Sequence, residues 1–353
     1  MMKPVAKKKF THPKGLYVLF TAEMWERFSF YGMRAILILF MTTEMAQEGL
    51  GLTTETAGAV YGLYTASVYL MTLPGGWLAD NIFGQRKAVF YGGVLIMIGH
   101  LILAIPGSPA IFFIGLAFVA LGTGLLKGNI STLVGELYEG EDGAKRDAGF
   151  SIFYMGINLG AFFGQILVPL LADINWHLGF GLAAIGMFLG LIVYRVYAPK
   201  YLGDIGIEPK VKSLEKTGKS NKTFTIGIIA FVLALMVFLQ YIGTIDVTTA
   251  VGLAKALGII IVVITMGYFS NILFNGGLSV QEKKKVTVIF ILFVGIAVFW
   301  SGFEQAASSL NLFARDFTDR FIGSWEMPAG MLQSFNSGFI IIFAPIVGAI
   351  WVK

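Results

Sequence analysis

The 353-residue sequence contains no cysteine and only three histidines, His12, His100 and His177. The absence of cysteine excludes disulfide bonds, thiol nucleophiles and cysteine-ligated metal sites. The three histidines lack the spacing of a metal-ligand motif, so no metal site is expected. Charged residues are also few, at 13% of the chain, whereas 56% of the residues are hydrophobic. This composition is not that of a soluble domain and indicates an integral membrane protein.

Motifs for catalysis and cofactor binding are missing as well. The sequence has no Walker loop, no HExxH, no nucleophile elbow and no haem or iron–sulfur signature. An intramembrane hydrolase would need Glu26 or Glu304 as its catalytic carboxylate, and neither has a partner at a suitable motif spacing. We therefore expect no enzyme and no cofactor. The net charge of +5 does not indicate a nucleic-acid partner, because the basic residues lie between apolar runs.

Apolar runs long enough to cross about 30 Å of hydrocarbon recur along the chain. We predict an all-α polytopic membrane protein with ten spans, at residues 16–41, 54–79, 87–106, 110–137, 148–171, 178–198, 223–243, 250–274, 286–313 and 330–352. The lysine-rich start resembles a signal peptide, but the run that follows is too long, contains charges and lacks a small-residue cleavage site. It is therefore predicted to be retained as the first span.

The basic residues alternate from one connection to the next. They gather in the N-terminal tail and in the second-to-third, fourth-to-fifth, sixth-to-seventh and eighth-to-ninth connections. The intervening connections at 42–53, 107–109, 172–177 and 244–249 contain none, and the exceptions are Lys255, Arg315 and Arg320. Basic loops face the cytoplasm, so this pattern predicts a cytoplasmic N-terminus.

The polar, basic segment 199–222 separates six runs from four. We predict an N-terminal six-helix bundle at 1–198, a cytoplasmic linker at 199–222, a lipid-facing helix pair at 223–274 and the first part of a second bundle at 275–353. Two bundles joined by a linker are typical of secondary transporters.

The first run contains four charges, on Glu23, Glu26, Arg27 and Arg34. A charge near the bilayer centre costs roughly 2.5–3.5 kcal/mol, so such residues usually mark an ion pathway, a proton relay or a polar substrate. The alternative is a self-neutralising structural cluster, since Glu23 and Arg27 are four residues apart on a helix. That alternative leaves Arg34 without a partner in its own run, which favours function.

Two more charges lie well inside later runs, away from their ends. Lys127 is near the middle of the fourth run, and Glu304 is in the ninth, eleven residues from its nearest charge in sequence, Arg315. Glu304 is therefore a candidate proton site. Each also has a structural alternative: Lys127 paired with a first-run glutamate, and Glu304 paired across helices with Lys127 or Arg34.

Polar and small residues mark further positions. Asn158 and Tyr154 are four residues apart and share a helix face, and Asn336 precedes Pro345 in the tenth run. Either asparagine can serve a ligand or an interhelical hydrogen bond. A glycine-rich turn follows the second run and contains Gly76, Asp80, Gly84, Arg86 and Lys87. We expect this turn to clamp helix ends through a salt bridge and a helix dipole, as a conformational motif.

Together these residues resemble the proton-dependent oligopeptide transporter family of the major facilitator superfamily. The family's first-span signature, ExxERFxYYG, is matched by Glu23 to Gly32, with Phe30 in place of the first tyrosine. Residues Gly76 to Lys87 resemble the superfamily's loop motif, and Phe153 to Gly160 the fifth-span signature. The runs within 223–274 are similar to the helix pair that bacterial members insert between the bundles.

The resemblance implies a proton-coupled symporter of di- and tripeptides in the bacterial inner membrane, working by alternating access between two six-helix bundles. Its partners would be short peptides, protons and the lipid bilayer. Proton coupling would involve Glu23, Glu26, Arg27 and Glu304. Arg34 and Lys127 would bind the peptide's carboxylate, and Asn158 and Asn336 its amino end. Tyr31, Tyr69, Tyr154 and Trp300 would line side-chain pockets.

Only two core spans follow the inserted pair, so the resemblance also implies a chain that lacks about four C-terminal helices. Two other functions stay open. A carrier of other small anions or of drugs would use the same two cations. A membrane receptor or subunit would bind a ligand without transporting it.

Overall fold

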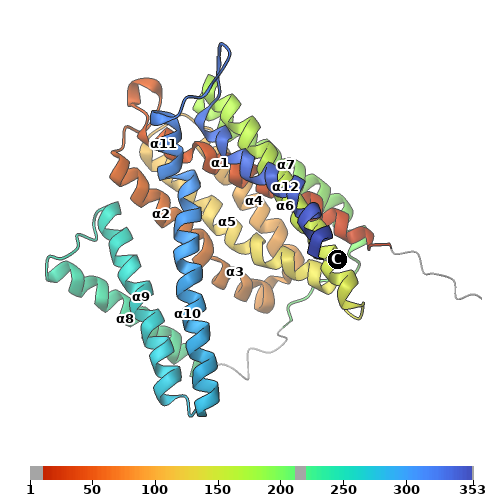
Figure 1. Ribbon diagram of the computed structural model, residues 1–353, viewed down its shortest axis with the longest axis vertical. Helices are drawn as coiled ribbons and strands as arrows, with labels where there is room; N and C mark the ends of the chain where they lie inside the picture. Colours follow the sequence, from red (N-terminus) through yellow and green to blue (C-terminus); the bar gives the residue numbers. More distant parts are fainter. Residues whose placement is uncertain (1–10, 211–219, 352–353) are drawn as a thin grey trace, which may run out of the picture. The chain divides into compact units, whose positions relative to one another are not determined.

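A computed structural model describes residues 11–210 and 220–351. Lysines 3, 7, 8, 9 and 353, together with residues 211–219 of the predicted linker, lie outside the described residues. The described chain is nearly all helical (Figure 1). The α-helices are α1 (Lys14–Thr42), α2 (Thr54–Leu70), α3 (Thr72–Leu78), α4 (Gln85–Leu103), α5 (Pro109–Glu136), α6 (Gly143–Ile174), α7 (Trp176–Tyr201), α8 (Ser220–Tyr241), α9 (Ala250–Asn275), α10 (Val280–Phe303), α11 (Ser309–Phe317) and α12 (Ser334–Trp351). One antiparallel hairpin, β1 (Phe321–Ile322) and β2 (Trp325–Glu326), departs from the predicted all-α class.

Each predicted run coincides with helix, but two runs are interrupted. The second is split into α2 and α3, and the ninth into α10, a 3₁₀ segment (Glu304–Ala307) and α11. Helical segments that break inside an apolar run are tolerated where protein partners satisfy the freed backbone groups. The second break follows Phe303, at the candidate proton site Glu304.

The ten predicted spans are not all confirmed. Within residues 11–210 and 220–351, seven helices are long and apolar enough to cross a membrane, which is consistent with a multi-pass protein. The other three runs fall short for different reasons. Helix α1 has too many charges and α2 has 17 residues, whereas α8 is described fully enough for this comparison only over the apolar stretch Phe231–Tyr241.

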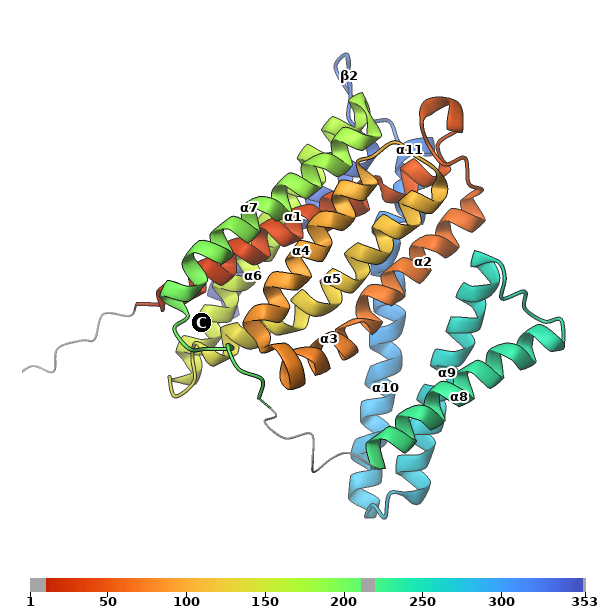
Figure 2. The ribbon, with the colours of Figure 1, turned by 180° about the vertical axis from the view of Figure 1, so that it is seen from behind.

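The chain forms two compact units. The first comprises the described parts of Met1–Met33, Val68–Lys212 and Ser334–Lys353. In it α4 packs against α5 and α7, and α3 against α5 (Figure 2), while α6 packs against α7 and α12 (Figure 1). Its core includes Leu19, Ile96, Ile130, Phe153 and Met187, from five different helices. Close helix approach depends on glycine: a Cβ on Gly92 of α4 would lie 2.7 Å from the Gly122 carbonyl oxygen of α5.

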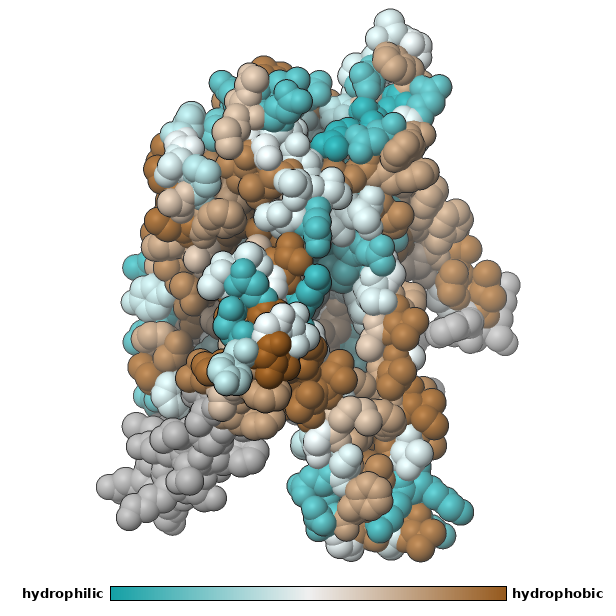
Figure 3. Space-filling view, turned by 90° about the vertical axis from the view of Figure 1, so that its left-hand side faces the viewer, coloured by the Kyte–Doolittle hydropathy of each residue, from teal (hydrophilic) through white to brown (hydrophobic). Residues whose placement is uncertain are grey.

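The second unit comprises Arg34–Ser67 and the described part of Ser213–Gln333. A small apolar cluster of Leu239, Ile245 and Ala256 closes the α8–α9 hairpin, and α9 in turn packs on α10. None of the residues of α10 is buried, so its apolar side chains are available to lipid. Figure 3 shows a hydrophilic lower tip on the molecule. The N-terminal part of α10 contains the exposed lysines 283–285. The predicted boundaries at 198, 222 and 274 stay predictions.

Candidate proton and substrate site

The charged segment of α1 forms a buried cluster in the first unit. The Arg27 Nε atom lies 2.7 Å from Glu23 Oε1 and 2.9 Å from Glu26 Oε2. All three residues are at most 3% exposed. The helical spacing places Glu23 and Arg27 on one face, as the sequence indicates. Both oxygens of Glu26 and one of Glu23 lack a hydrogen-bond donor among the residues that the structure describes.

One guanidinium cannot neutralise two buried carboxylates, so this cluster needs a further positive charge. Lys127 of α5 supplies one, since its ammonium interacts electrostatically with Glu26. The same ammonium lies 4.1 Å from the centre of the Tyr69 ring, a cation–π geometry. Lys127, Tyr69 and the first-run carboxylates are therefore neighbours within the first unit. This electrostatic interaction with Glu26 is compatible with the predicted alternative, in which Lys127 pairs with a first-run glutamate.

Arg34, farther along α1, belongs to the second unit and is paired there with Glu304. Arg34 Nη2 lies 2.5 Å from Glu304 Oε2, across 270 residues of sequence. The guanidinium also donates to the Tyr61 hydroxyl from Nε, at 2.9 Å, and from Nη2. Arg34 is 6% and Tyr61 4% exposed, whereas the Glu304 side chain is 23% exposed. The structure therefore pairs Glu304 with Arg34, which is one of its two predicted partners.

Glu304 lies at a discontinuity in its helix. Helix α10 ends at Phe303, and the 3₁₀ segment that begins with Glu304 leads to Ser308, whose φ of −126° and ψ of −101° are not helical. Helix α11 then begins at Ser309, and Asn311 donates a 2.8 Å hydrogen bond to the Ala35 carbonyl of α1. Broken helices in transporters commonly line binding sites. The break thus places the Glu304 carboxylate at the junction between α10 and α11.

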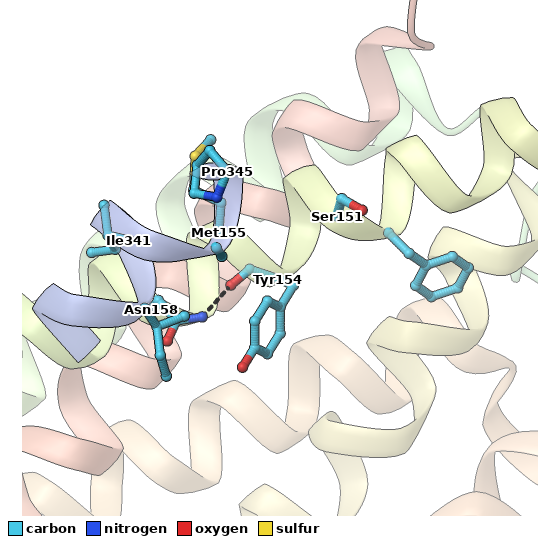
Figure 4. A pocket seen from close by; sticks show the side chains of 9 residues that line it. Ser151, Tyr154, Met155, Asn158, Ile341 and Pro345 are labelled. Carbon is cyan, nitrogen blue, oxygen red and sulfur yellow. Dashed lines mark hydrogen bonds between the residues drawn. The ribbon is translucent and has the colours of Figure 1, made fainter. Parts of the chain in front are cut away.

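Tyr154 and Asn158 line a cavity of about 590 Å³ between α6 and α12 (Figure 4). The Asn158 amide donates to the Tyr154 carbonyl at 2.9 Å, and the Tyr154 ring is half exposed. Ser151 and Met155 of α6 and Pro345 of α12 also contribute to the wall. This cavity is large enough for a small ligand and combines apolar walls with a few polar groups, as ligand pockets do.

The remaining predicted substrate residues are spread over both units. Trp300 is half exposed on α10 and contacts the Phe303 ring edge-to-face at 5.1 Å. Tyr31 is partly buried beside Phe30, their ring centroids 5.3 Å apart. Asn336 is exposed at the start of α12 and does not line the α6–α12 cavity.

The predicted conformational motif folds as a tight turn, but not with the expected salt bridge. Among the described residues Asp80 accepts a hydrogen bond from Gln85 at 2.8 Å and forms no ion pair with Arg86 or Lys87. Arg86 instead donates to the Gly203 carbonyl, at 2.6 Å from Nη1. Between them Gly84 adopts φ 75°, which favours glycine. The correction has a simple cause: Arg86 is the N2 residue of α4 and reaches the segment that follows α7.

Gly76 lies in α3, before this turn, and a Cβ there would meet nothing within 4 Å. The structure therefore gives no steric reason for glycine at that position. Lys87 is on the first turn of α4. The role of the motif in conformational change stays a prediction.

Sequence reasoning missed Tyr61 and Ser151. Tyr61 is one of several tyrosines in the second run, and only the pairing with Arg34 distinguishes it. Ser151 resembles any small residue in a membrane helix, and its cavity position depends on α12. Neither has a local signal in the sequence.

The sequence profile of the POT family matches residues 86–353. The chain belongs to this family. The predicted resemblance to the proton-dependent oligopeptide transporters is thus confirmed at the level of the family.

Among its relatives, the Peptide transporter YePEPT of Yersinia enterocolitica is 41% identical over 99% of this chain and 69% of its own length. A Di-/tripeptide transporter of Lactococcus lactis subsp. cremoris is 37% identical over 98% of this chain and 70% of its own length. A crystal structure of a peptide transporter POT in complex with sulfate is 44% identical, with a TM-score of 0.84 over 98% of this chain and 70% of that chain. The chain therefore spans about 70% of the length of these relatives.

Proposed function

We propose that this POT family chain takes part in proton-coupled uptake of di- and tripeptides by alternating access. The observation that carries the proposal is the ion pair between Arg34 and Glu304, held at a helix break and oriented by Tyr61. Relatives named as di-/tripeptide transporters support the substrate class. No cofactor is part of this proposal, in which the proton is the coupling ion.

The ion pair supplies a simple exchange mechanism. While Glu304 is ionised, it occupies the Arg34 guanidinium, and a peptide carboxylate must compete with it. Protonation of Glu304 removes the competing charge, and Arg34 is then available to an incoming carboxylate. With Glu304 protonated and a peptide bound, the ion pair between Arg34 of α1 and Glu304 is lost. This loss changes the relative free energies of the outward-facing and inward-facing conformations.

The α1 cluster has the composition of a second proton site. Glu26 is fully buried, has no hydrogen-bond donor among the described residues and shares Arg27 with Glu23. The negative charge of Glu26 can be neutralised either by a proton on its carboxylate or by the ammonium of Lys127. Lys127 would then be released to bind substrate when Glu26 is protonated. The assignments of Asn158, Asn336 and the aromatic residues to the peptide rest on the family resemblance.

The test is uptake of labelled dialanine into liposomes under an inward proton gradient. With Glu304→Gln, acid-driven accumulation should be lost, while exchange of internal for external dialanine persists, because binding no longer depends on protonation. The control Glu326→Gln removes the half-exposed carboxylate of the Arg320–Glu326 pair at the β-hairpin. It should behave as the parent chain. Acid-driven accumulation by the Glu304→Gln variant would contradict the proposal.

We further propose ten spans with a cytoplasmic N-terminus in the bacterial inner membrane. Since the sequence contains no cysteine, single cysteines can be labelled without background. Glu139, after α5, and Ser108, before it, are exposed at opposite ends of that helix. An impermeant maleimide applied to intact cells should label Ser108→Cys and not Glu139→Cys. Labelling of only Glu139→Cys would reverse the proposed topology.

A further inference from the structure

A second cavity, of about 220 Å³, lies in the first unit on the side of α1 that the charged cluster does not use. We name it the α1–α6–α7 crevice. Its lining consists of Met24, Trp25, Phe28, Leu159, Gly160, Phe163, Leu167, Leu182, Ile185, Gly186 and Leu189. Every one of these residues is apolar or glycine. The crevice is therefore distinct in chemistry from the α6–α12 cavity, which includes Tyr154 and Asn158.

The crevice has an open mouth and a closed floor. Phe163, Leu167, Ile185 and Leu189 form the mouth and are 38–55% exposed. The floor is Phe28, which is 4% exposed. Glycines shape the floor: a Cβ on Gly160 or on Gly186 would come within 3.0 Å of Phe28 atoms. The two glycines thus allow α6 and α7 to approach α1 closely and leave a notch above it.

The crevice lies near the middle of all three helices. Met24, Trp25 and Phe28 are central in α1, Leu159 to Phe163 in α6, and Ile185 to Leu189 in α7. Helix α7 has 26 residues and is about 39 Å long at 1.5 Å per residue, longer than the hydrocarbon core. Its midpoint is therefore deep in the hydrocarbon when the helix spans a membrane.

Depth and lining together determine what fills the crevice. A water molecule needs two to four polar partners, and among the lining side chains only the Trp25 indole carries a hydrogen-bond donor. An empty notch would leave its apolar walls without dispersion contacts on one side. At this depth the surrounding solvent is lipid hydrocarbon, which has a matching chemistry and can enter through the exposed mouth.

We propose that the α1–α6–α7 crevice binds one acyl chain of a membrane phospholipid. The chain would lie against Trp25 and Phe28, which alternate along α1 with the buried residues Glu23, Glu26 and Arg27. The acyl chain thereby packs against the side of α1 that the charged cluster does not use, and it supports the helix segment that contains the cluster. Binding of the acyl chain does not depend on the proposed transport activity.

Trp25 allows a direct test, because bromine on an acyl chain quenches indole fluorescence on contact. The full chain is prepared with its five other tryptophans replaced by phenylalanine and is reconstituted into phosphatidylcholine brominated either at mid-chain or near the headgroup. We expect quenching of Trp25 by the mid-chain bromines in preference to the headgroup-proximal ones.

Blocking the mouth gives the decisive comparison. Ile185→Phe should abolish the preferential mid-chain quenching, whereas Ile192→Phe, seven residues on along α7 and outside the crevice, should leave it unchanged. Leu189→Phe serves as a second blocking variant if Ile185→Phe does not reconstitute. Equal quenching in the parent and in both blocking variants would overturn the proposal. The proposal would also be overturned if Trp25 were not quenched and crosslinks formed between protein copies at the crevice, because a second copy of the protein would then occupy it.

Discussion

Removal of the Tyr61 hydroxyl should weaken substrate binding at Arg34. In Tyr61→Phe the aromatic ring stays, but the oxygen that accepts from Arg34 Nε at 2.9 Å and from Nη2 is lost. Both donors share one oxygen, so we count one charge-assisted hydrogen bond, of about 1.5–3 kcal/mol. That range corresponds to roughly 10- to 100-fold in an equilibrium constant. Because Glu304 still holds the guanidinium, we expect the lower end, about tenfold.

The assay is the dialanine concentration that gives half-maximal proton-driven uptake in liposomes. Tyr61→Phe should raise it about tenfold through misorientation of Arg34. The matched control is Tyr268→Phe on α9, whose ring is 62% exposed and contacts Phe269, a contact that phenylalanine retains. If Tyr61→Phe and Tyr268→Phe have the same half-maximal concentration as the parent chain, Tyr61 does not orient Arg34 for substrate.

Two further predictions concern stability. Gly164→Ala should lower the unfolding temperature, because its Cβ would lie about 3.0 Å or less from backbone atoms of α1, whereas Gly128→Ala, with nothing within 4 Å, should not. Equal unfolding temperatures for the two variants would refute close α1–α6 packing. In the α8–α9 turn, hydrogen bonds from the Thr248 hydroxyl and amide hold the pKa of Asp246 below its ordinary value of 3.8. A lowered pKa stabilises the turn above the unfolded pKa, and this contribution disappears as the pH falls through the folded pKa. The measurement is amide hydrogen exchange in the turn, in the parent chain and in Asp246→Asn. Protection in the parent chain should exceed that in the variant at neutral pH and should fall to the variant's level only below about pH 4. A difference in protection that persists in strong acid would refute this role of Asp246.

Local sequence patterns determine much of the fold. Apolar run length predicts the helices, and the i,i+4 spacing predicts the Glu23–Arg27 pair. The interruptions are harder, because the break after Phe303 lies within a continuous apolar run. The hydropathy of a run also does not decide whether the helix can span a membrane, since four of the five charges of α1 are buried by packing that hydropathy does not describe.

The candidate site depends on contacts between residues far apart in the sequence. Arg34 and Glu304 are 270 residues apart, and either Arg34 or Lys127 is a reasonable partner on charge alone. Tyr61 has the same local surroundings as other tyrosines of its run. In the turn motif, the sequence suggests a local salt bridge of Asp80. In the structure, Arg86 instead donates to the Gly203 carbonyl, which is distant in sequence. Only the tertiary packing distinguishes such alternatives.

The central claim is that proton movement and peptide movement are coupled through the buried ionised groups. Its most direct test is the internal pH of liposomes, read by an enclosed dye, when dialanine is added outside without an imposed proton gradient. The account predicts acidification of the lumen by the parent chain and none by Glu304→Gln. Dialanine entry into parent liposomes with no change in internal pH would contradict it.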